Sequence, residues 1–254
     1  METLTSLKNP RVALWRSLKD HKARKETGLF LVEGRKMVAE ALASHFDVET
    51  VLCDAAQTEA FAPLLNQCET VLLPEHVLAA VCDTKTPQGI AAVVRMHTET
   101  RQGPRLVALD GVQDPGNVGT ILRTADAAGF DGLLLSEQCA DIFSPKVLRA
   151  TMGSIFRMGV TVTPDLPGLL THLREQGYSV ISSQLDGTPF YQREGVAAQF
   201  VLVIGNEGEG VGRLVKEKCD MVASIPMKGD IDSLNASVAA GVLAYEIVRQ
   251  RLQA

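Results

Sequence analysis

The sequence lacks the features that define several common classes of protein. No run approaches the roughly 20 consecutive apolar residues of a membrane-spanning helix, and the amino terminus has no apolar core like that of a signal peptide. The five cysteines are odd in number, widely spaced and free of any C-x-x-C pair. We therefore predict a cytoplasmic protein without membrane association, whose thiols are reduced and form neither disulfide bonds nor zinc sites.

The motifs of several familiar enzymes are absent as well. A dinucleotide fingerprint would need a third glycine where Arg213 stands, and a Walker loop would need Gly-Lys where Gly210 and Val211 stand. The sequence also lacks H-E-x-x-H, G-x-S-x-G and any His/Cys grouping with metal-ligand spacing. These absences argue against zinc hydrolysis and serine acyl transfer, and we expect no metal ion.

What is present suits an α/β protein of two domains. The chain has 254 residues, of which 46% are hydrophobic, enough for a substantial core. Short apolar runs alternate with helical patterns on both sides of residues 97–105, HTETRQGPR, whose polar side chains, Gly and Pro are typical of a linker. We predict a smaller α/β domain over residues 1–96 and a larger one over residues 106–254.

The net charge of −5 conceals a basic amino terminus. Residues 1–40 contain nine Lys or Arg and five Asp or Glu, so this segment carries +4 and the remainder −9. Cations crowded around Trp15 and His21 could contact phosphates. The plain alternative is a solvated amphipathic helix with a buried apolar side. The cations are Lys8, Arg11, Arg16, Lys19, Lys22, Arg24 and Lys25, and the apolar residues are Leu7, Val12, Leu14, Trp15 and Leu18.

Short apolar strands that alternate with helices predict a parallel sheet in the larger domain, with helices on both faces. There we expect strands at 106–110, 132–137, 157–163, 179–185, 200–205 and 223–227, and helices at 117–128, 145–151, 166–176 and 233–251. In the smaller domain we expect strands at 30–34, 48–54, 70–74 and 89–96, and helices at 35–44, 58–67 and 75–81.

The first polar cluster of the larger domain follows the strand at 106–110. The turn Asp114-Pro115-Gly116 leads to Asn117, which we expect to cap a helix whose second turn carries Arg123. A loop that joins the carboxyl end of a parallel strand to a helix is where open α/β sheets usually bind ligands. The plain alternative is an ordinary turn with a solvated arginine.

Two further polar clusters also follow predicted strands. Asn206, Glu207 and Glu209 lie among glycines after the strand at 200–205, and glycines allow a ligand to approach the main chain closely. After the last strand, Asp232 or Ser233 is expected to cap the final helix, near Asn235 and Ser237. Three clusters of Asn, Ser, Glu and Arg without an evident nucleophile suit the alignment of two substrates for a direct transfer.

In order, spacing and strand-end placement, the three clusters resemble the three motifs of the SpoU/TrmH family of RNA methyltransferases. The matching residues are 114–119 with Arg123, 204–208, and 225–227 with 233–237. This resemblance covers residues 104–254. Glu33-Gly34 and Pro87-Gln88-Gly89 also resemble the ribosomal-protein-like substrate-recognition domain that precedes the catalytic domain in many members.

The resemblance implies a parallel-sheet catalytic domain with a deep trefoil knot (SPOUT, or α/β knot), preceded by an RNA-recognition domain. It further implies S-adenosylmethionine as cofactor, a homodimer, and methylation of a ribose 2′-hydroxyl in RNA. Ribosomal RNA is the expected substrate because of the additional domain, and transfer RNA is the alternative. The implied cofactor-binding residues are Gly205, Asn206, Ile225, Met227, Ser233 and Leu234, and the implied catalytic residues are Asn117, Arg123, Glu207, Ser233 and Asn235.

Arg123 resembles the family arginine assigned to activating the hydroxyl. A guanidinium group stays protonated near neutral pH and is a poor base. We therefore expect Arg123 to pair with an RNA phosphate and to stabilise the developing alkoxide, while the proton passes to that phosphate or to water.

Two other functions stay open on the sequence alone. A Rossmann-like nucleotide enzyme would use Gly111, Gly116 and Gly119 as its phosphate turn and Glu137 as the ribose acceptor. The third possibility is a catalytically inactive RNA-binding or assembly factor, although the polar residues of all three motifs are intact.

Overall fold

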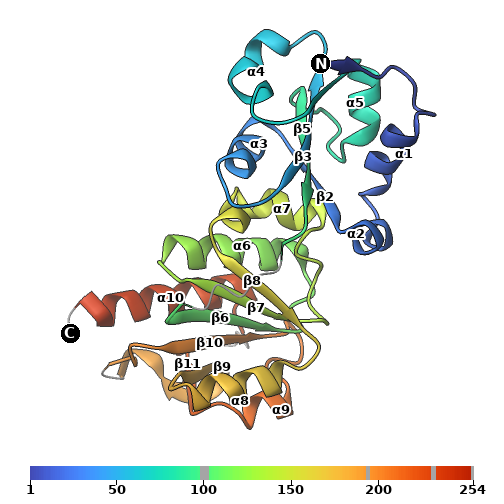
Figure 1. Ribbon diagram of the computed structural model, residues 1–254. Helices are drawn as coiled ribbons and strands as arrows, with labels where there is room; N and C mark the ends of the chain where they lie inside the picture. The colour runs from blue at the N-terminus through green and yellow to red at the C-terminus, as the bar shows by residue number, and fades with distance from the viewer. Residues whose placement is uncertain (98–102, 193–194, 230–232, 253–254) are drawn as a thin grey trace. The chain divides into compact units, whose positions relative to one another are not determined.

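The chain forms two compact units, which a computed structural model describes over residues 1–97, 103–192, 195–229 and 233–252 (Figure 1). Unit 1 contains Met1–His97 together with Phe143–Arg157, and unit 2 contains the rest of the described chain. Unit 1 ends at His97 before its return at Phe143, and residues 98–102 of the predicted linker lie outside the described ranges. The return of residues 143–157 to unit 1 differs from the predicted boundaries, which place everything after residue 105 in one domain.

Unit 1 is built on a mixed five-stranded sheet with the strand order β1-β4-β3-β5-β2. Strand β5 runs antiparallel to β2 and β3, and the other pairs are parallel. The elements are β1 (Glu2–Thr3), α1 (Pro10–Ser17), α2 (His21–Thr27), β2 (Leu29–Glu33), α3 (Arg35–Leu42), β3 (Val48–Asp54), α4 (Thr58–Leu65), β4 (Thr70–Leu73), α5 (Glu75–Val81), β5 (Ile90–Arg95), α7 (Pro145–Thr151) and the 3-10 helix η1 (Ser154–Phe156). The predicted strands and helices of the smaller domain are thus confirmed.

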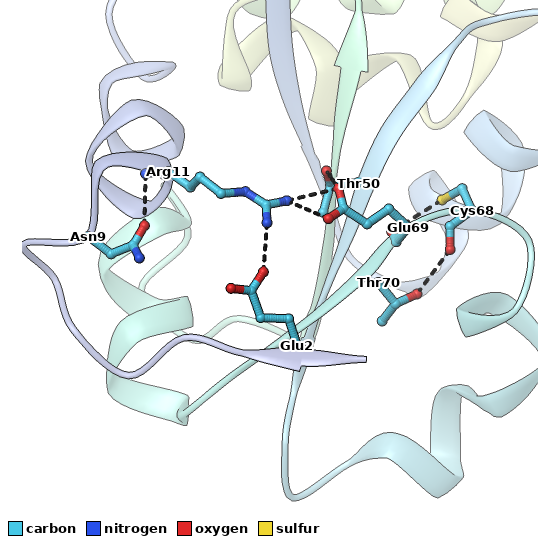
Figure 2. A network of polar contacts seen from close by, with 7 residues as sticks. All are labelled: Glu2, Asn9, Arg11, Thr50, Cys68, Glu69 and Thr70. Atoms are coloured by element: carbon cyan, nitrogen blue, oxygen red, sulfur yellow. Dashed lines mark hydrogen bonds and ion pairs between the residues drawn. The ribbon is translucent and has the colours of Figure 1, made fainter.

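The basic amino terminus forms two short helices, and part of its charge holds unit 1 together. Figure 2 shows Arg11 between two acidic side chains, with bonds of 2.8 Å to Glu2 and 2.8 Å to Glu69. The Arg11 guanidinium also lies 5.2 Å from the centre of the Trp15 ring. Arg24 is buried and donates to the carbonyl oxygens of Leu18 and Lys19 at 2.7 Å each.

The prediction of one amphipathic helix at the amino terminus, with five buried apolar residues, is wrong in part. Val12, Trp15 and Leu18 are buried, but Leu7 and Leu14 are exposed. The helix breaks between Ser17 and His21, because Asp20 begins a new helix. Leu7 lies in the turn that precedes α1, and Leu14 lies on the exposed side of α1. The side chains of Lys8, Arg16, Lys22 and Lys25 are exposed.

Unit 2 is built on a parallel six-stranded sheet with the order β11-β9-β10-β6-β7-β8. Figure 1 shows α6 and α10 on one face of this sheet and α8 and α9 on the other. The elements are β6 (Arg105–Asp110), α6 (Pro115–Ala127), β7 (Gly132–Ser136), β8 (Gly159–Thr163), α8 (Leu166–Glu175), β9 (Ser179–Pro189), the 3-10 helix η2 (Phe190–Gln192), β10 (Phe200–Gly205), α9 (Arg213–Lys216), β11 (Met221–Ser224) and α10 (Ala236–Leu252).

The predicted α/β class is confirmed, with a smaller mixed-sheet unit and a larger parallel-sheet unit. Central strands β6 and β10 pair so that Asp110 lies beside Gly205, which brings the first two polar clusters to the same edge of the sheet. Strand order alone does not test the knot, which stays a prediction. No described helix is long and apolar enough to cross a membrane.

Candidate active site

A cavity of about 630 Å³ opens at the carboxyl ends of the central strands of unit 2. That volume is within the range of small-molecule sites, about 300–1,000 Å³. The cavity brings together residues from the second and third polar clusters, which lie far apart in the sequence. All six predicted cofactor-binding residues line it, namely Gly205, Asn206, Ile225, Met227, Ser233 and Leu234, together with Glu207 and Asn235 of the predicted catalytic set.

Asn206 organises the loop that follows β10. Its side-chain oxygen accepts hydrogen bonds from the N–H groups of Gly208 at 2.8 Å and Glu209 at 3.1 Å. Its amide nitrogen donates to the carbonyl of Gly111 at 2.8 Å. Asn206 therefore ties the second polar cluster to the first, across the carboxyl ends of two neighbouring strands.

Gly205 is required by the shape of this same loop. A Cβ atom at position 205 would lie 2.1 Å from the carbonyl carbon of Gly210 and 2.2 Å from the nitrogen of Val211. The loop folds back against its own strand, and only glycine leaves room for it. The main chain at Gly205 therefore lies close to the main chain of Gly210 and Val211, and this contact within the protein requires glycine whether or not a ligand is bound.

A chain of side-chain hydrogen bonds joins all three polar clusters. Asn235 donates from its amide nitrogen to the side-chain oxygen of Asn117 at 3.0 Å, and Asn117 donates to the carboxylate of Glu207 at 2.9 Å. With both ends of its amide engaged, Asn117 is held in one orientation and is buried. The three residues are thereby fixed relative to one another.

Glu207 is held as a carboxylate. Partial burial raises the pKa of Glu207, but hydrogen bonds from Asn117 and from the main-chain N–H groups of Gln113 and Asp114 outweigh this effect. The pKa of Glu207 therefore lies below its ordinary value. The site thus holds a negative charge beside the cavity.

The helix caps differ from the predicted ones. Asp114 caps α6 by accepting a hydrogen bond from the N–H of Asn117 at 2.9 Å, which places Asn117 in the first turn and leaves its side chain for Glu207. Helix α10 begins later than predicted, because the side-chain oxygen of Asn235 accepts from the N–H groups of Ser237 at 2.9 Å and Val238 at 3.3 Å. Asp232, one of the two predicted caps, lies outside the described residues, and Ser233 precedes the true cap.

Arg123 does not line the cavity. It is exposed on α6, six residues after Asn117, which corresponds to a rise of about 9 Å along a helix. Glu137, the ribose acceptor of the Rossmann alternative, is also absent from the lining. The first motif therefore contributes a buried amide beside the cavity and an exposed cation at a distance from it.

Sequence reasoning missed one wall of the cavity, which Ser183, Gln184 and Leu185 form. Strand β9 pairs Ser182 with Val222 and then Thr188 with Ala223, so residues 183–187 bulge out of the ladder. The dipeptide Asp186-Gly187 at the end of this bulge is a local signal that could have indicated it, because a glycine inside a strand pattern often marks a bulge. Lys216 of α9 also lines the cavity.

The lining suits the predicted cofactor. Ile204, Val211, Ile225, Met227 and Leu234 offer apolar walls for an adenosyl group. Glu207 and Glu209 provide negative charge near the cavity, as a ligand with sulfonium and ammonium groups requires. Among the described residues, no group of three or more His, Cys, Asp or Glu could hold a metal ion.

Comparisons with known families match both parts of the chain. The sequence pattern of the SpoU rRNA Methylase family matches residues 104–245, and that of the MRM3-like substrate binding domain matches residues 9–92. The 23S rRNA (guanosine(2553)-2′-O)-methyltransferase RlmP of Bacillus subtilis is 40% identical over 248 residues, which cover 97% of this chain and 99% of that protein.

Solved structures give the same match along nearly the whole chain. The AdoMet-bound rRNA methyltransferase of Sinorhizobium meliloti is 32% identical with a TM-score of 0.85, covering 99% of this chain and 98% of that one. The SpoU methyltransferase AviRb of Streptomyces viridochromogenes, in complex with the cofactor AdoMet, is 28% identical with a TM-score of 0.85, covering 96% and 99% of the two chains.

Proposed function

The chain belongs to the SpoU rRNA methylase family and is an S-adenosylmethionine-dependent RNA 2′-O-ribose methyltransferase, and we propose that its substrate is ribosomal RNA of the large subunit. The observation that carries this proposal is the cavity around which the second and third motifs meet, with Asn117 of the first motif bonded to its edge. The match to the Bacillus subtilis 23S rRNA enzyme along nearly both full lengths supports the choice of RNA.

Mapping of 2′-O-methyl groups tests the substrate. RNA from a strain without this protein should lose one ribose methyl group in large-subunit ribosomal RNA, and the purified protein should restore it in vitro. The guanosine equivalent to the one named for the Bacillus subtilis relative is the first position to examine. Loss of a methyl group from transfer RNA instead, with the ribosomal pattern unchanged, would overturn the proposal.

Within the cavity, the roles follow the chemistry of the lining. The main chain near Gly205, Ile225 and Leu234 holds the cofactor, Met227 contacts its adenine, and Asn206 and Ser233 complete the wall. When bound, S-adenosylmethionine supplies an activated methyl group. The acidic side chain of Glu207, bonded to Asn117, favours a cationic ligand at this edge of the cavity.

The catalytic surface aligns the ribose and stabilises charge. Asn117, Glu207, Ser233 and Asn235 orient the 2′-oxygen, and Arg123 pairs with an RNA phosphate. As the oxygen bonds to the methyl carbon, the carbon–sulfur bond breaks and its electron pair stays on sulfur. The hydroxyl proton leaves to the phosphate or to water, while Arg123 stabilises the developing negative charge. Arg123→Lys, which keeps the charge but loses the forked geometry, should therefore lower kcat.

Recognition of RNA belongs to residues 1–96 in this proposal. The match of residues 9–92 to a substrate binding domain supports it, as do the exposed cations Lys8, Arg16, Lys22 and Lys25. Phosphate contacts of this kind weaken as salt rises. The affinity for RNA should accordingly fall with salt, and less steeply after Lys22→Ala and Lys25→Ala together.

The protein works as a homodimer that pairs through α10. Val238, Tyr245 and Leu252 recur every seven residues, so they share one face of the helix, and they are 50%, 52% and 83% exposed. An apolar stripe of this kind is a common protein interface. Sedimentation should show a dimer that Tyr245→Glu dissociates and Arg251→Glu, on the same helix, leaves intact. A monomeric wild-type protein would exclude this arrangement.

A further inference from the structure

The segment Phe143–Arg157 lies inside the stretch that matches the methylase family, yet it packs as part of unit 1. It comprises α7 and η1 and links β7 to β8 of the catalytic sheet. The described chain therefore leaves unit 2 after Ile142 and re-enters it at Met158. We name residues 143–157 the inserted segment.

Aromatic rings hold the inserted segment in the core of unit 1. The ring of Phe143 lies 4.8 Å from that of Phe30, and the ring of Phe156 lies 5.2 Å from that of Phe46. All four side chains are buried. Buried aromatic pairs at such separations contribute about 0.5–1.5 kcal/mol each beyond the burial of their area. Both ends of the segment are thus anchored.

Two ion pairs add polar anchors. Arg149 lies 2.8 Å from the carboxylate of Asp83, and Arg157 lies 2.5 Å from that of Glu40. The main-chain N–H of Asp83 in turn donates to Glu33 at 2.6 Å, which fixes the loop that carries the first pair. The partners lie 66 and 117 residues away in the sequence, so the pairs are specific to the fold.

The turn between α7 and η1 is strained. Met152 has φ +52°, and it is the one non-glycine residue with positive φ in the described chain. Gly153 follows with φ +98°, and a Cβ atom there would lie 3.0 Å from Cγ of Glu40. The left-handed backbone of Met152 costs about 1–3 kcal/mol and persists only where the surroundings enforce it. The segment is therefore held in one conformation within unit 1.

The chain just before the inserted segment is bonded to the loop that precedes Asn117. Ala140 donates its N–H to the carbonyl of Val112 at 2.9 Å, and the Cys139 thiol donates to the carbonyl of Leu109 at 3.3 Å. Gly111, in the middle of this loop, donates its N–H to Ser136 at 2.9 Å and accepts from Asn206 at 2.8 Å. A displacement of residues 139–142 would thus reach the active-site loop directly.

We propose that the inserted segment is a positioning element, which couples RNA bound by unit 1 to the geometry of the loop 109–112 and hence of Asn117. This inference rests on the proposed function. Arg149 and Arg157 contact neither cofactor nor substrate in this proposal and act through the anchoring of the segment. Their contribution should therefore appear in kcat, while the affinities for cofactor and RNA stay constant.

Steady-state kinetics with the natural RNA tests the proposal. The double variant Arg149→Ala/Arg157→Ala should lose about tenfold or more in kcat, because small misplacements of aligned groups cost large factors in rate. Its Kd for S-adenosylmethionine and for RNA should stay within about twofold of wild type. Arg174→Ala removes an exposed arginine that pairs with Asp220 within unit 2 and does not line the cavity, and it should leave kcat unchanged.

A charge swap separates positioning from a general loss of structure. Arg157→Glu should lower kcat, and adding Glu40→Arg should restore it, since the pair is re-formed with opposite polarity. Wild-type kcat in the double variant, a loss confined to RNA affinity, or failure of the swap to restore kcat would each overturn the proposal.

Hydrogen exchange gives a readout that does not need methylation. Binding of RNA to the wild-type protein should change exchange at residues 109–113, and the double variant should bind RNA without that change. If the wild-type protein bound RNA but did not methylate it, the proposed function would fail. The exchange experiment would still show whether RNA binding by unit 1 changes the loop 109–112. An unchanged exchange pattern in wild type would refute it.

Discussion

The two units use their polar side chains in opposite ways. In unit 1, Arg11 and Arg24 bond to carboxylates and carbonyls of neighbouring elements and hold the unit together. In unit 2, Asn117 and Glu207 bond to each other beside an open cavity. The difference teaches that a polar cluster in a sequence becomes a candidate site only when its residues surround a space that a ligand could fill. Changes in unit 2 should accordingly reduce activity, and changes in unit 1 should reduce stability.

Removal of the Asn117 amide should have the largest effect. Asn117→Ala leaves the Glu207 carboxylate without its side-chain donor and removes a residue of the proposed catalytic surface, so kcat should fall by about 100-fold or more. The free energy of unfolding should fall by only about 1–3 kcal/mol, because Glu207 and Asn235 each lose one hydrogen-bond partner. Thr120→Ala, exposed on the same helix, is the matched control. Normal kcat in Asn117→Ala would remove this residue from the catalytic set.

Arg24→Met should give the next largest effect, now on stability. It removes the donor to the buried carbonyl of Leu18 and the partly buried carbonyl of Lys19, which should cost about 2–4 kcal/mol of unfolding free energy. Trp15 is the single tryptophan of the chain and lies in unit 1, so its fluorescence in urea reports this loss. Lys25→Met, an exposed neighbour, should leave the transition unchanged. If Arg24→Met lost cofactor binding but kept its stability, the assignment of a structural role to the polar side chains of unit 1 would be wrong.

Arg11→Ala should have a smaller effect of the same kind. The Arg11 side chain is 37% exposed, and exposed ion pairs contribute about 0.2–1 kcal/mol. A double-mutant cycle with Glu69→Ala, followed by the same fluorescence, isolates the pair. A coupling free energy of several kcal/mol would mean that this network does more than hold α1 against the sheet.

The pH dependence of Glu207 should give the smallest effect, because solvent screens its exposed carboxylate. A carboxylate whose pKa is lowered by folding stabilises the folded state above its unfolded pKa, about 4.3 for glutamate. That contribution disappears as pH falls through the lowered folded value. The stability difference between wild type and Glu207→Gln should therefore be constant from pH 7 to about 5 and shrink at lower pH. A difference that grows with acid would contradict the lowered pKa.

Local patterns were sufficient to predict most of the fold. Strands β3 and β10 and helices α5 and α7 begin and end at the predicted residues, because apolar runs and helical periodicity are strong there. The caps were less predictable. Asp114 and Asn117 are both good capping residues, and only the bond from Asn117 to Glu207 decides between them. The two-residue strand β1 carries no periodicity at all.

The residues of the cavity were largely predictable, since the motifs follow strands whose carboxyl ends share one edge of the sheet. The wall formed by residues 183–185 was not, because a bulge depends on pairing between strands. The same limit applies to the inserted segment. Its packing on Phe30 and Phe46 depends on contacts across more than 90 residues, which no local pattern records.

The discontinuity of unit 1 also sets an order of events during synthesis. Because Phe143 and Phe156 complete its aromatic core, unit 1 cannot finish folding when residue 97 leaves the ribosome. The 60 further residues to Arg157 require about 3 to 12 seconds at typical rates of translation, about 5–20 residues per second. During that interval Phe30 and Phe46 lack the rings of Phe143 and Phe156, and strands β6 and β7 of the catalytic sheet emerge. The recognition unit therefore reaches its native core only after synthesis of the catalytic unit has begun.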